Sequence, residues 1–265
     1  MKKFICISAA VAVGLFCAFS FGGCRTGEAR VEYTLSEDKT YYIVSGVSGD
    51  KLGLTSYEIP AQYSAEEGGE LLPVKEIGDD AFVQCFYLED VTLPDSIEKI
   101  GERAFAKCGF TKFVIPESVT HIGFAAFGAC EYLSEITVPE SVTTLEPRVF
   151  VSCPALEKAY VKANITVLDY GVFYNPSYAQ GGETYYSTSL TELHLPATLQ
   201  KIHKEALEGN FLTDIYFDGT RAQWDELYFY NMVDDEENEG GKKENRLEKS
   251  DVLGSGTEIH CKDDN

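Results

Sequence analysis

The chain has 265 residues, 44% of them hydrophobic, and a formal net charge of −21 at pH 7. The hydrophobic content is sufficient for a core, and so acidic a surface repels phosphate backbones, which excludes nucleic acid as a partner. We interpret the charge as a source of solubility and of repulsion from an anionic cell envelope.

Residues 1–23 have the layout of a secretory signal peptide. Residues 2–3 are lysines, residues 4–21 are uncharged and apolar, and two glycines precede Cys24. A positive start followed by an apolar run and small residues is typical of a segment that the mature protein lacks. The sequence therefore predicts export.

The end of this leader, Phe-Gly-Gly-Cys, resembles a bacterial lipobox, in which the cysteine is lipidated and becomes the new N-terminus. Phe21 departs from the leucine usually found three residues before that cysteine. We expect lipid attachment at Cys24 and membrane contact through that lipid only. Ordinary cleavage after residues 18–20 is one alternative, and a retained anchor is another, although the apolar run is at the short limit for spanning a bilayer.

Residues 24–32 are expected to be a tether, and residues 33–56 an N-terminal β-hairpin. The sequence from Tyr33 alternates and turns around the polar connection Ser-Glu-Asp-Lys. A lone hairpin is marginally stable in water. We therefore expect it to cap the open end of the segment that follows.

Residues 57–225 repeat one unit of 22 or 23 residues about six times. A sustained period of this size predicts a solenoid of stacked coils. The period is easiest to follow in a series of phenylalanines: Phe82, Phe105, Phe127, Phe150 and Phe173.

Each unit has three parts. A strand with the spacing Leu-x-x-Leu-x-Leu, as in residues 88–93, is ended by Pro94, because proline cannot donate to the ladder. A short extended piece follows, as in residues 97–100. Last comes an expected helical turn that faces Phe105 and Cys108 inward. The predicted fold class is therefore an α/β repeat solenoid, a leucine-rich-repeat coil with short strands and short helical turns.

Four cysteines recur in register, and we expect them to form a column of small buried groups near the backbone. Neighbouring coils lie about 4.8 Å apart, within the reach of a disulfide, so bridged pairs in an exported protein are the alternative. No metal site is predicted, since the chain has no Cys-x-x-Cys and its four histidines are scattered. The column consists of Cys85, Cys108, Cys130 and Cys153.

An insertion at residues 177–187 must loop out of the fifth coil. Tyr185 and Tyr186 lie in it beside a Gly-Gly pair, and exposed tyrosine gives a large contact area at low entropic cost. They are candidate ligand-binding residues. The alternative is that the loop folds these rings back over the solenoid.

Residues 226–265 are expected to form an acidic loop and a C-terminal closing strand. Residues 234–249 are charged and polar, and their carboxylates lack the alternating spacing of a calcium loop. The closing strand is predicted at residues 258–261.

Two positions of each repeat strand should point outward. The first series is charged, its first five signs alternate, and neighbours are expected to pair across strands, so we interpret it as structural. The second series is uncharged and becomes aromatic in the later units. Three rings on adjacent strands, expected to form a flat platform for a sugar face or a peptide, are the leading ligand-binding candidates: Tyr160, His194 and Tyr216. The alternative is that β-propensity alone placed them there.

The turn motif Ile-Gly-x-x-Ala-Phe-x-x-Cys, the step Ile-Pro-x-Ser-Val-x-x-Ile and the terminal Gly-Thr-x-x-x-Trp resemble the BspA-like, or treponemal-type, leucine-rich-repeat family of bacterial surface proteins. The resemblance covers roughly residues 57–225. It implies adhesion and ligand binding through varied surfaces. It supplies no shared catalytic residues.

Catalytic signatures for serine hydrolysis, zinc proteolysis, phosphate cradling and dinucleotide binding are absent from the sequence. We therefore expect no enzyme and no cofactor, but a monomeric cell-surface module that binds an extracellular protein or glycan, lipid-anchored or secreted. A structural envelope scaffold is the alternative. Polysaccharide hydrolysis would need two carboxylates about 5–10 Å apart in a cleft.

Overall fold

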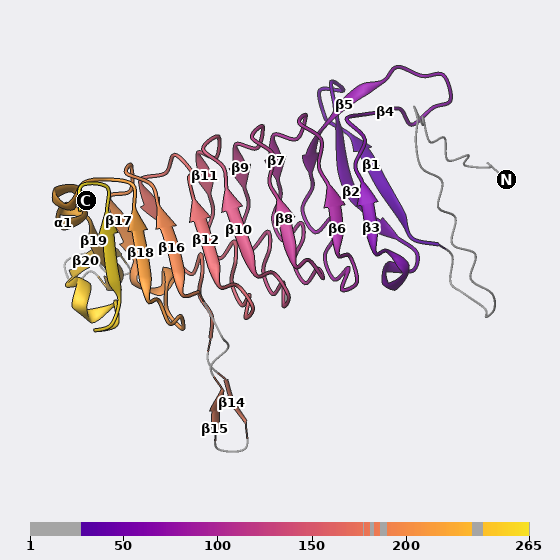
Figure 1. Ribbon diagram of the computed structural model, residues 1–265. Helices are drawn as coiled ribbons and strands as arrows, with labels where there is room; N and C mark the ends of the chain where they lie inside the picture. Colours follow the sequence, from indigo (N-terminus) through magenta and orange to yellow (C-terminus); the bar gives the residue numbers. More distant parts are fainter. Residues whose placement is uncertain (1–27, 177, 181–182, 186–189, 235–240, 265) are drawn as a thin grey trace.

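The computed structural model describes residues 28–176, 178–180, 183–185, 190–234 and 241–264. These residues form one elongated solenoid whose coils follow one another along the chain (Figure 1). The predicted repeat solenoid is confirmed. None of the helices in the described ranges is long and apolar enough to cross a bilayer.

The Leu-x-x-Leu-x-Leu segments form a six-stranded parallel sheet along one side of the solenoid. In β10, β12, β16 and β18 the leucine-type positions are buried and the positions between them face solvent or are half-buried. Its strands, in spatial order, are β8 (Lys112–Val114), β10 (Glu135–Val138), β12 (Lys158–Val161), β16 (Glu192–Leu195), β18 (Asp214–Phe217) and β21 (Glu258–Cys261). The parallel pair β3 (Ser56–Glu58) and β6 (Asp90–Thr92) continues the row at the N-terminal end (Figure 1).

The second extended piece of each unit builds a sheet along another side of the coils. It begins with the antiparallel hairpin β1 (Arg30–Leu35) and β2 (Tyr42–Ser48), and β2 pairs in parallel with the first repeat strand of this sheet. The remaining members are β4 (Gln62–Tyr63), β5 (Leu72–Ile77), β7 (Lys99–Ile100), β9 (His121–Ile122) and β11 (Thr144–Leu145).

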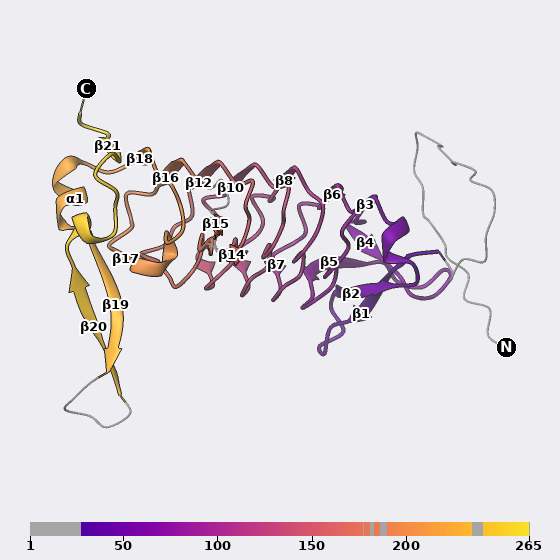
Figure 2. The same cartoon turned by 90° about the horizontal axis from the view of Figure 1, so that it is seen from below.

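The C-terminal part of this side is a separate four-stranded sheet, of order β13 (Val167–Leu168), β17 (Lys201–His203), β19 (Tyr228–Asp234) and β20 (Lys242–Leu247). The strands β19 and β20 form an antiparallel hairpin that extends away from the solenoid (Figure 2). A loop was expected over much of this region. Strands form instead, and side chains pair across them. Asp234 forms an ion pair with Lys242, and the side-chain amide of Asn245 donates a hydrogen bond to Asn231 Oδ1.

Helical structure is sparse in the described residues. The helix α1 (Arg221–Glu226) closes the last repeat and carries the buried Trp224. Single 3-10 turns are η1 (Lys51–Gly53), η2 (Lys204–Ala206) and η3 (Lys249–Asp251).

The third part of the early units differs from the expected helical turn. It contains two residues of positive φ four positions apart, for example Arg103 at 49° and Lys107 at 61°. Every second N–H group of the turn bonds to the next coil, as in Phe105 N to Ala126 O at 2.8 Å, and the N–H groups between them bond within the coil, as in Ala106 N to Arg103 O at 3.0 Å. A helix would have kept these bonds inside one unit. Bonding between coils lets each unit satisfy the backbone of its neighbour.

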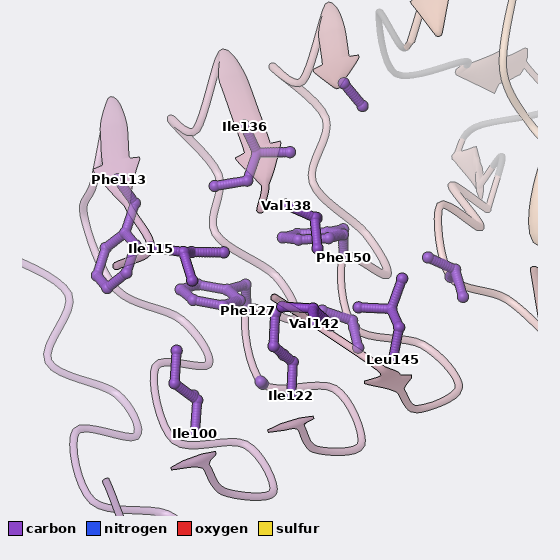
Figure 3. Packing of buried hydrophobic residues seen from close by; sticks show 14 of the residues in the cluster. Ile100, Phe113, Ile115, Ile122, Phe127, Ile136, Val138, Val142, Leu145 and Phe150 are labelled. Atoms are coloured by element: carbon purple, nitrogen blue, oxygen red, sulfur yellow. The ribbon is translucent and has the colours of Figure 1, made fainter. Parts of the chain in front are cut away.

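The core is a continuous stack that runs the length of the repeats. The five periodic phenylalanines are all at most 2% exposed, and their rings follow one another at centroid distances of 5.2, 5.5, 5.5 and 5.4 Å. Figure 3 shows Phe127 and Phe150 in this stack, with aliphatic side chains of the two sheets on either side. Stacked aromatic pairs add attraction beyond burial alone.

Candidate functional site

The predicted aromatic residues lie side by side on the exposed face of the six-stranded sheet. Tyr160, His194 and Tyr216 occupy the same register position of β12, β16 and β18. The next strand, β21, adds His260 opposite Tyr216. We call these four residues the ring ladder.

The rings of the ladder pack against one another along the sheet, the first pair tilted by 30°. Their centroids are 4.4 Å apart for Tyr160 and His194, 4.5 Å for His194 and Tyr216, and 4.5 Å for Tyr216 and His260. The last two pairs are nearly parallel, at 10° and 15°. A flat platform was expected, but strands about 4.8 Å apart leave no room for neighbouring rings to lie flat. The ladder therefore presents ring edges to solvent.

Carboxylates in the neighbouring outward series hold the first part of the ladder. Glu192 accepts hydrogen bonds from Lys158 Nζ at 2.7 Å and Tyr160 Oη at 3.3 Å, and its Oε1 lies 3.0 Å from His194 Nε2. These bonds favour the ionised carboxylate, with Lys158 the largest contributor, and lower the pKa of Glu192.

The far end of the ladder repeats this arrangement with Asp214. Its Oδ1 lies 2.9 Å from His260 Nε2, and Thr213 Oγ1 donates to Oδ2 at 2.8 Å. The hydrogen bonds from His260 and Thr213 lower the pKa of Asp214. Tyrosine and histidine rings thus alternate along four adjacent strands, and each histidine lies beside a carboxylate.

In the charged outward series, the signs of the charges alternate as expected only as far as β16. Lys158 and Glu192 form the expected ion pair across strands. Beyond them Asp214 and Glu258 lie directly opposite each other on β18 and β21. Three successive strands therefore carry a carboxylate at this position, so the charges of the series do not cancel at its C-terminal end.

A second feature is a groove of about 440 Å³ beside the hairpin β19–β20. The buried His203 lines it and makes edge-to-face contacts with the rings of Tyr170 and Tyr230, at centroid distances of 5.2 and 5.0 Å. Burial lowers the pKa of His203, and its Nδ1 accepts a hydrogen bond from Glu205 N at 3.2 Å. A neutral imidazole packed by two tyrosines in this way serves the local packing of the C-terminal sheet.

The comparisons with known proteins agree with the repeat geometry. The sequence profile described as the BspA type leucine-rich-repeat region matches residues 72–180 and 181–236, in six copies. The chain belongs to the BspA-type leucine-rich-repeat family. No curated protein matches the chain at a significant level.

Solved structures of other bacterial leucine-rich-repeat proteins resemble this BspA-type chain. A protein from Bacteroides ovatus is 24% identical over 71% of this chain and 54% of its own, with a TM-score of 0.50. The present chain thus spans about half the length of that relative. A protein from Bacteroides capillosus is 32% identical over 48% of this chain and 91% of its own, with a TM-score of 0.42. A Treponema pallidum protein is 21% identical over 71% and 82%, with a TM-score of 0.45.

From the sequence we did not place two outward residues of β21 on the exposed strand face of this BspA-type chain. Residues 258–261 were recognised as a closing strand, but His260 and Glu258 were not placed in the outward series. The signal was present, because Glu258-Ile259-His260 repeats the pattern of Glu192-Leu193-His194. We did not recognise this pattern because residues 258–260 lie far along the chain from the last periodic unit.

The other candidate residues contribute less to the described site. Tyr185 ends β15 (Glu183–Tyr185), whose backbone pairs with β14 (Tyr178–Gln180) in an antiparallel hairpin. Tyr186 and the lipidation candidate Cys24 lie outside the described residues. The five described cysteines are buried and free, so no disulfide joins the coils there.

Two carboxylates do come together, although on an open surface. Among the described residues, Asp214, Glu258 and His260 offer ligand atoms that all lie within 4.8 Å of one another. Asp214 and Glu258 sit on the exposed strand face, and neither lines the groove beside β19–β20. This placement gives no enclosed cleft in which a glycosidase pair would work.

Proposed function

We propose that this protein is an exported surface module that binds an extracellular protein partner through the ring ladder. Leucine-rich-repeat surface proteins generally act as protein-interaction modules, and solenoids offer extended faces for that purpose. The observation that carries the proposal is the ladder itself: four half-exposed rings packed against one another on four adjacent strands, with Glu192 and Asp214 beside the two histidines.

The geometry favours a protein partner over a glycan. Each inner ring of the ladder is covered on both faces by its neighbours, so its flat face is not free to stack on a sugar. The solvent side instead presents ring edges, hydroxyls, imidazole nitrogens and carboxylates. Tyrosine is enriched at the energetic centres of protein interfaces, and a stacked ring loses little entropy on binding.

The leader supports a position outside the cell. A signal peptide over residues 1–23 with lipid attachment at Cys24 would hold the solenoid at the membrane through residues 24–32, with secretion as the alternative. An acidic chain tethered in this way stays clear of an anionic envelope and can reach partners beyond it. Radiolabelled palmitate incorporation that is lost in Cys24→Ala would establish the anchor.

Binding of the purified chain to a panel of extracellular-matrix proteins and glycans tests the proposed function. The triple variant Tyr160→Ala, His194→Ala and Tyr216→Ala is expected to lose at least about 2 kcal/mol of binding free energy, as for hot-spot truncation. The matched control replaces three residues at the same register position of earlier strands: Thr92→Ala, Val114→Ala and Thr137→Ala.

A partner that is lost in the ladder variant and kept in the control supports the proposal, provided that circular dichroism shows both variants folded. A partner that binds the ladder variant with unchanged affinity contradicts it. If the well-folded chain binds no member of the panel, the envelope scaffold becomes the better explanation of the fold.

A further inference from the structure

The break in the charge alternation at the C-terminal end of the sheet needs a physical explanation. Asp214 and Glu258 face the same side on adjacent parallel strands and are directly opposite each other. Like charges in this relation destabilise a sheet. Within the described residues neither carboxylate forms an ion pair with a lysine or arginine, whereas Glu192 one strand earlier is neutralised by Lys158 at 2.7 Å.

An imidazole lies against this uncompensated pair. His260 is two residues along β21 from Glu258, on the same face of the strand, and its Nε2 is 2.9 Å from Asp214 Oδ1. All three ligand atoms lie within 4.8 Å of one another. Ligands around one tetrahedral zinc ion are roughly 3.3–3.6 Å apart, as follows from Zn–N and Zn–O bonds of about 2.0–2.2 Å. Small side-chain rotations would bring the three atoms to that spacing.

We propose that Asp214, Glu258 and His260 form a binding site for a divalent transition-metal cation, with Zn²⁺ as the best match. A cation at this position replaces the missing positive charge of the series. One imidazole nitrogen with two carboxylates suits zinc better than calcium or magnesium, which take six or more oxygen ligands. Three protein ligands leave a fourth position open for water or for a side chain of a partner.

Two features of the surroundings prepare the site. Thr213 Oγ1 donates to Asp214 Oδ2 at 2.8 Å and fixes that carboxylate, and Tyr216 stacks on the His260 ring at 4.5 Å and 15°. Contacts from residues that do not themselves bind the metal hold the ligand side chains in the right orientation before the ion binds. The edge position of β21 in the sheet leaves the ion a path from solvent.

The other histidine–carboxylate pairs of the chain serve as internal controls. His194 and Glu192 are 3.0 Å apart on the same ladder, but Lys158 already occupies that carboxylate. His121 and Glu146 are 3.1 Å apart on the other sheet, where Glu146 also accepts from Phe124 N at 2.9 Å. Only the group at β18 and β21 combines a histidine with two carboxylates among the described residues.

Isothermal titration calorimetry of the purified, tag-free chain with ZnCl₂ under reducing conditions tests the proposal. One Zn²⁺ ion per chain is expected, with no comparable heat from CaCl₂ or MgCl₂. Asp214→Asn, Glu258→Gln and His260→Gln should each raise the Kd by more than about tenfold, since even changes outside the ligand set have effects of that size. Glu192→Gln and His194→Gln should leave the Kd unchanged.

Cobalt substitution gives an independent readout. Bound Co²⁺ should show d–d absorption without the sulfur charge-transfer band that cysteine ligation would add. The proposal is overturned if the chain binds no Zn²⁺, if Glu258→Gln binds it as tightly as the parent, or if the control variants lose it equally. These measurements need no partner, so their failure would leave the proposed function of the ladder standing.

Discussion

At the scale of single residues, one buried hydrogen bond explains the periodic cysteines. Cys108 Sγ donates to Phe82 O at 3.3 Å, and Cys130 Sγ donates to Phe105 O at 3.3 Å. In the last unit Asn210 fills the same place, and its Nδ2 donates to Phe173 O at 2.7 Å. Thiol and amide are exchangeable here because both are small donors that satisfy a buried carbonyl of the preceding coil.

Burial should make these thiols unreactive in the native protein. It raises the pKa of Cys130 to about 12, with desolvation as the main cause, so almost none of the reactive thiolate is present at pH 8. We expect iodoacetamide to label the column only after denaturation. Peptide mass spectrometry of native and urea-treated samples would check this. Rapid native labelling of Cys130, or a disulfide between Cys108 and Cys130, would contradict it.

At the scale of elements, the turn and the phenylalanine stack act together. The inter-coil bond from Phe127 N to Val149 O, at 2.9 Å, fixes the backbone that carries one ring of the stack. That ring lies 5.5 Å from Phe105 on one side and 5.5 Å from Phe150 on the other. A turn with two residues of positive φ thus places a ring in the core once per coil.

Removing one ring should open a cavity that the rigid stack cannot close. Phe127→Ala is expected to lower the free energy of unfolding by about 3–5 kcal/mol. The control Phe86→Ala, at a side chain that is 48% exposed, should change it by no more than about 0.5 kcal/mol. Urea unfolding followed by circular dichroism measures both. Equal effects of the two substitutions would refute the role given to the stack.

At the scale of the whole molecule, the solenoid depends on what covers its two ends. The hairpin β1–β2 joins β5 at one end, where Val44 is fully buried and its carbonyl accepts from Gly78 N at 2.8 Å. At the other end the buried Trp224 of α1 packs on Phe217 at a centroid distance of 5.6 Å. Between them each coil contacts chiefly its neighbours, so damage at one end should remain local.

Val44→Asp tests this locality, because it buries an unpaired charge in the N-terminal cap. We expect faster hydrogen–deuterium exchange in β5 and β7, fading to no change in β16 and β18. Mass spectrometry of peptides from each strand gives the profile. Lys39→Asn, at an exposed turn residue with a φ of 61° that asparagine tolerates, is the control. A uniform rise across all strands would show one cooperative unit instead.

The sequence by itself determined the repeat architecture, the inward and outward positions of each strand, and the alignment of Tyr160, His194 and Tyr216. These follow from local alternation and from a period that sets the register between coils, and both are readable in one dimension. The family followed from the same motifs.

Only the tertiary structure decided how those positions meet. Rings about one strand spacing apart had to stack rather than lie flat. Every second N–H group of the turns bonded to the next coil, so that backbone groups of two units are satisfied together. The hairpin β19–β20 and the meeting of Asp214 with Glu258 and His260 lie where the period has ended. Without a repeat to fix register, contact between residues so distant in the chain depends on the folded path of the segments between them.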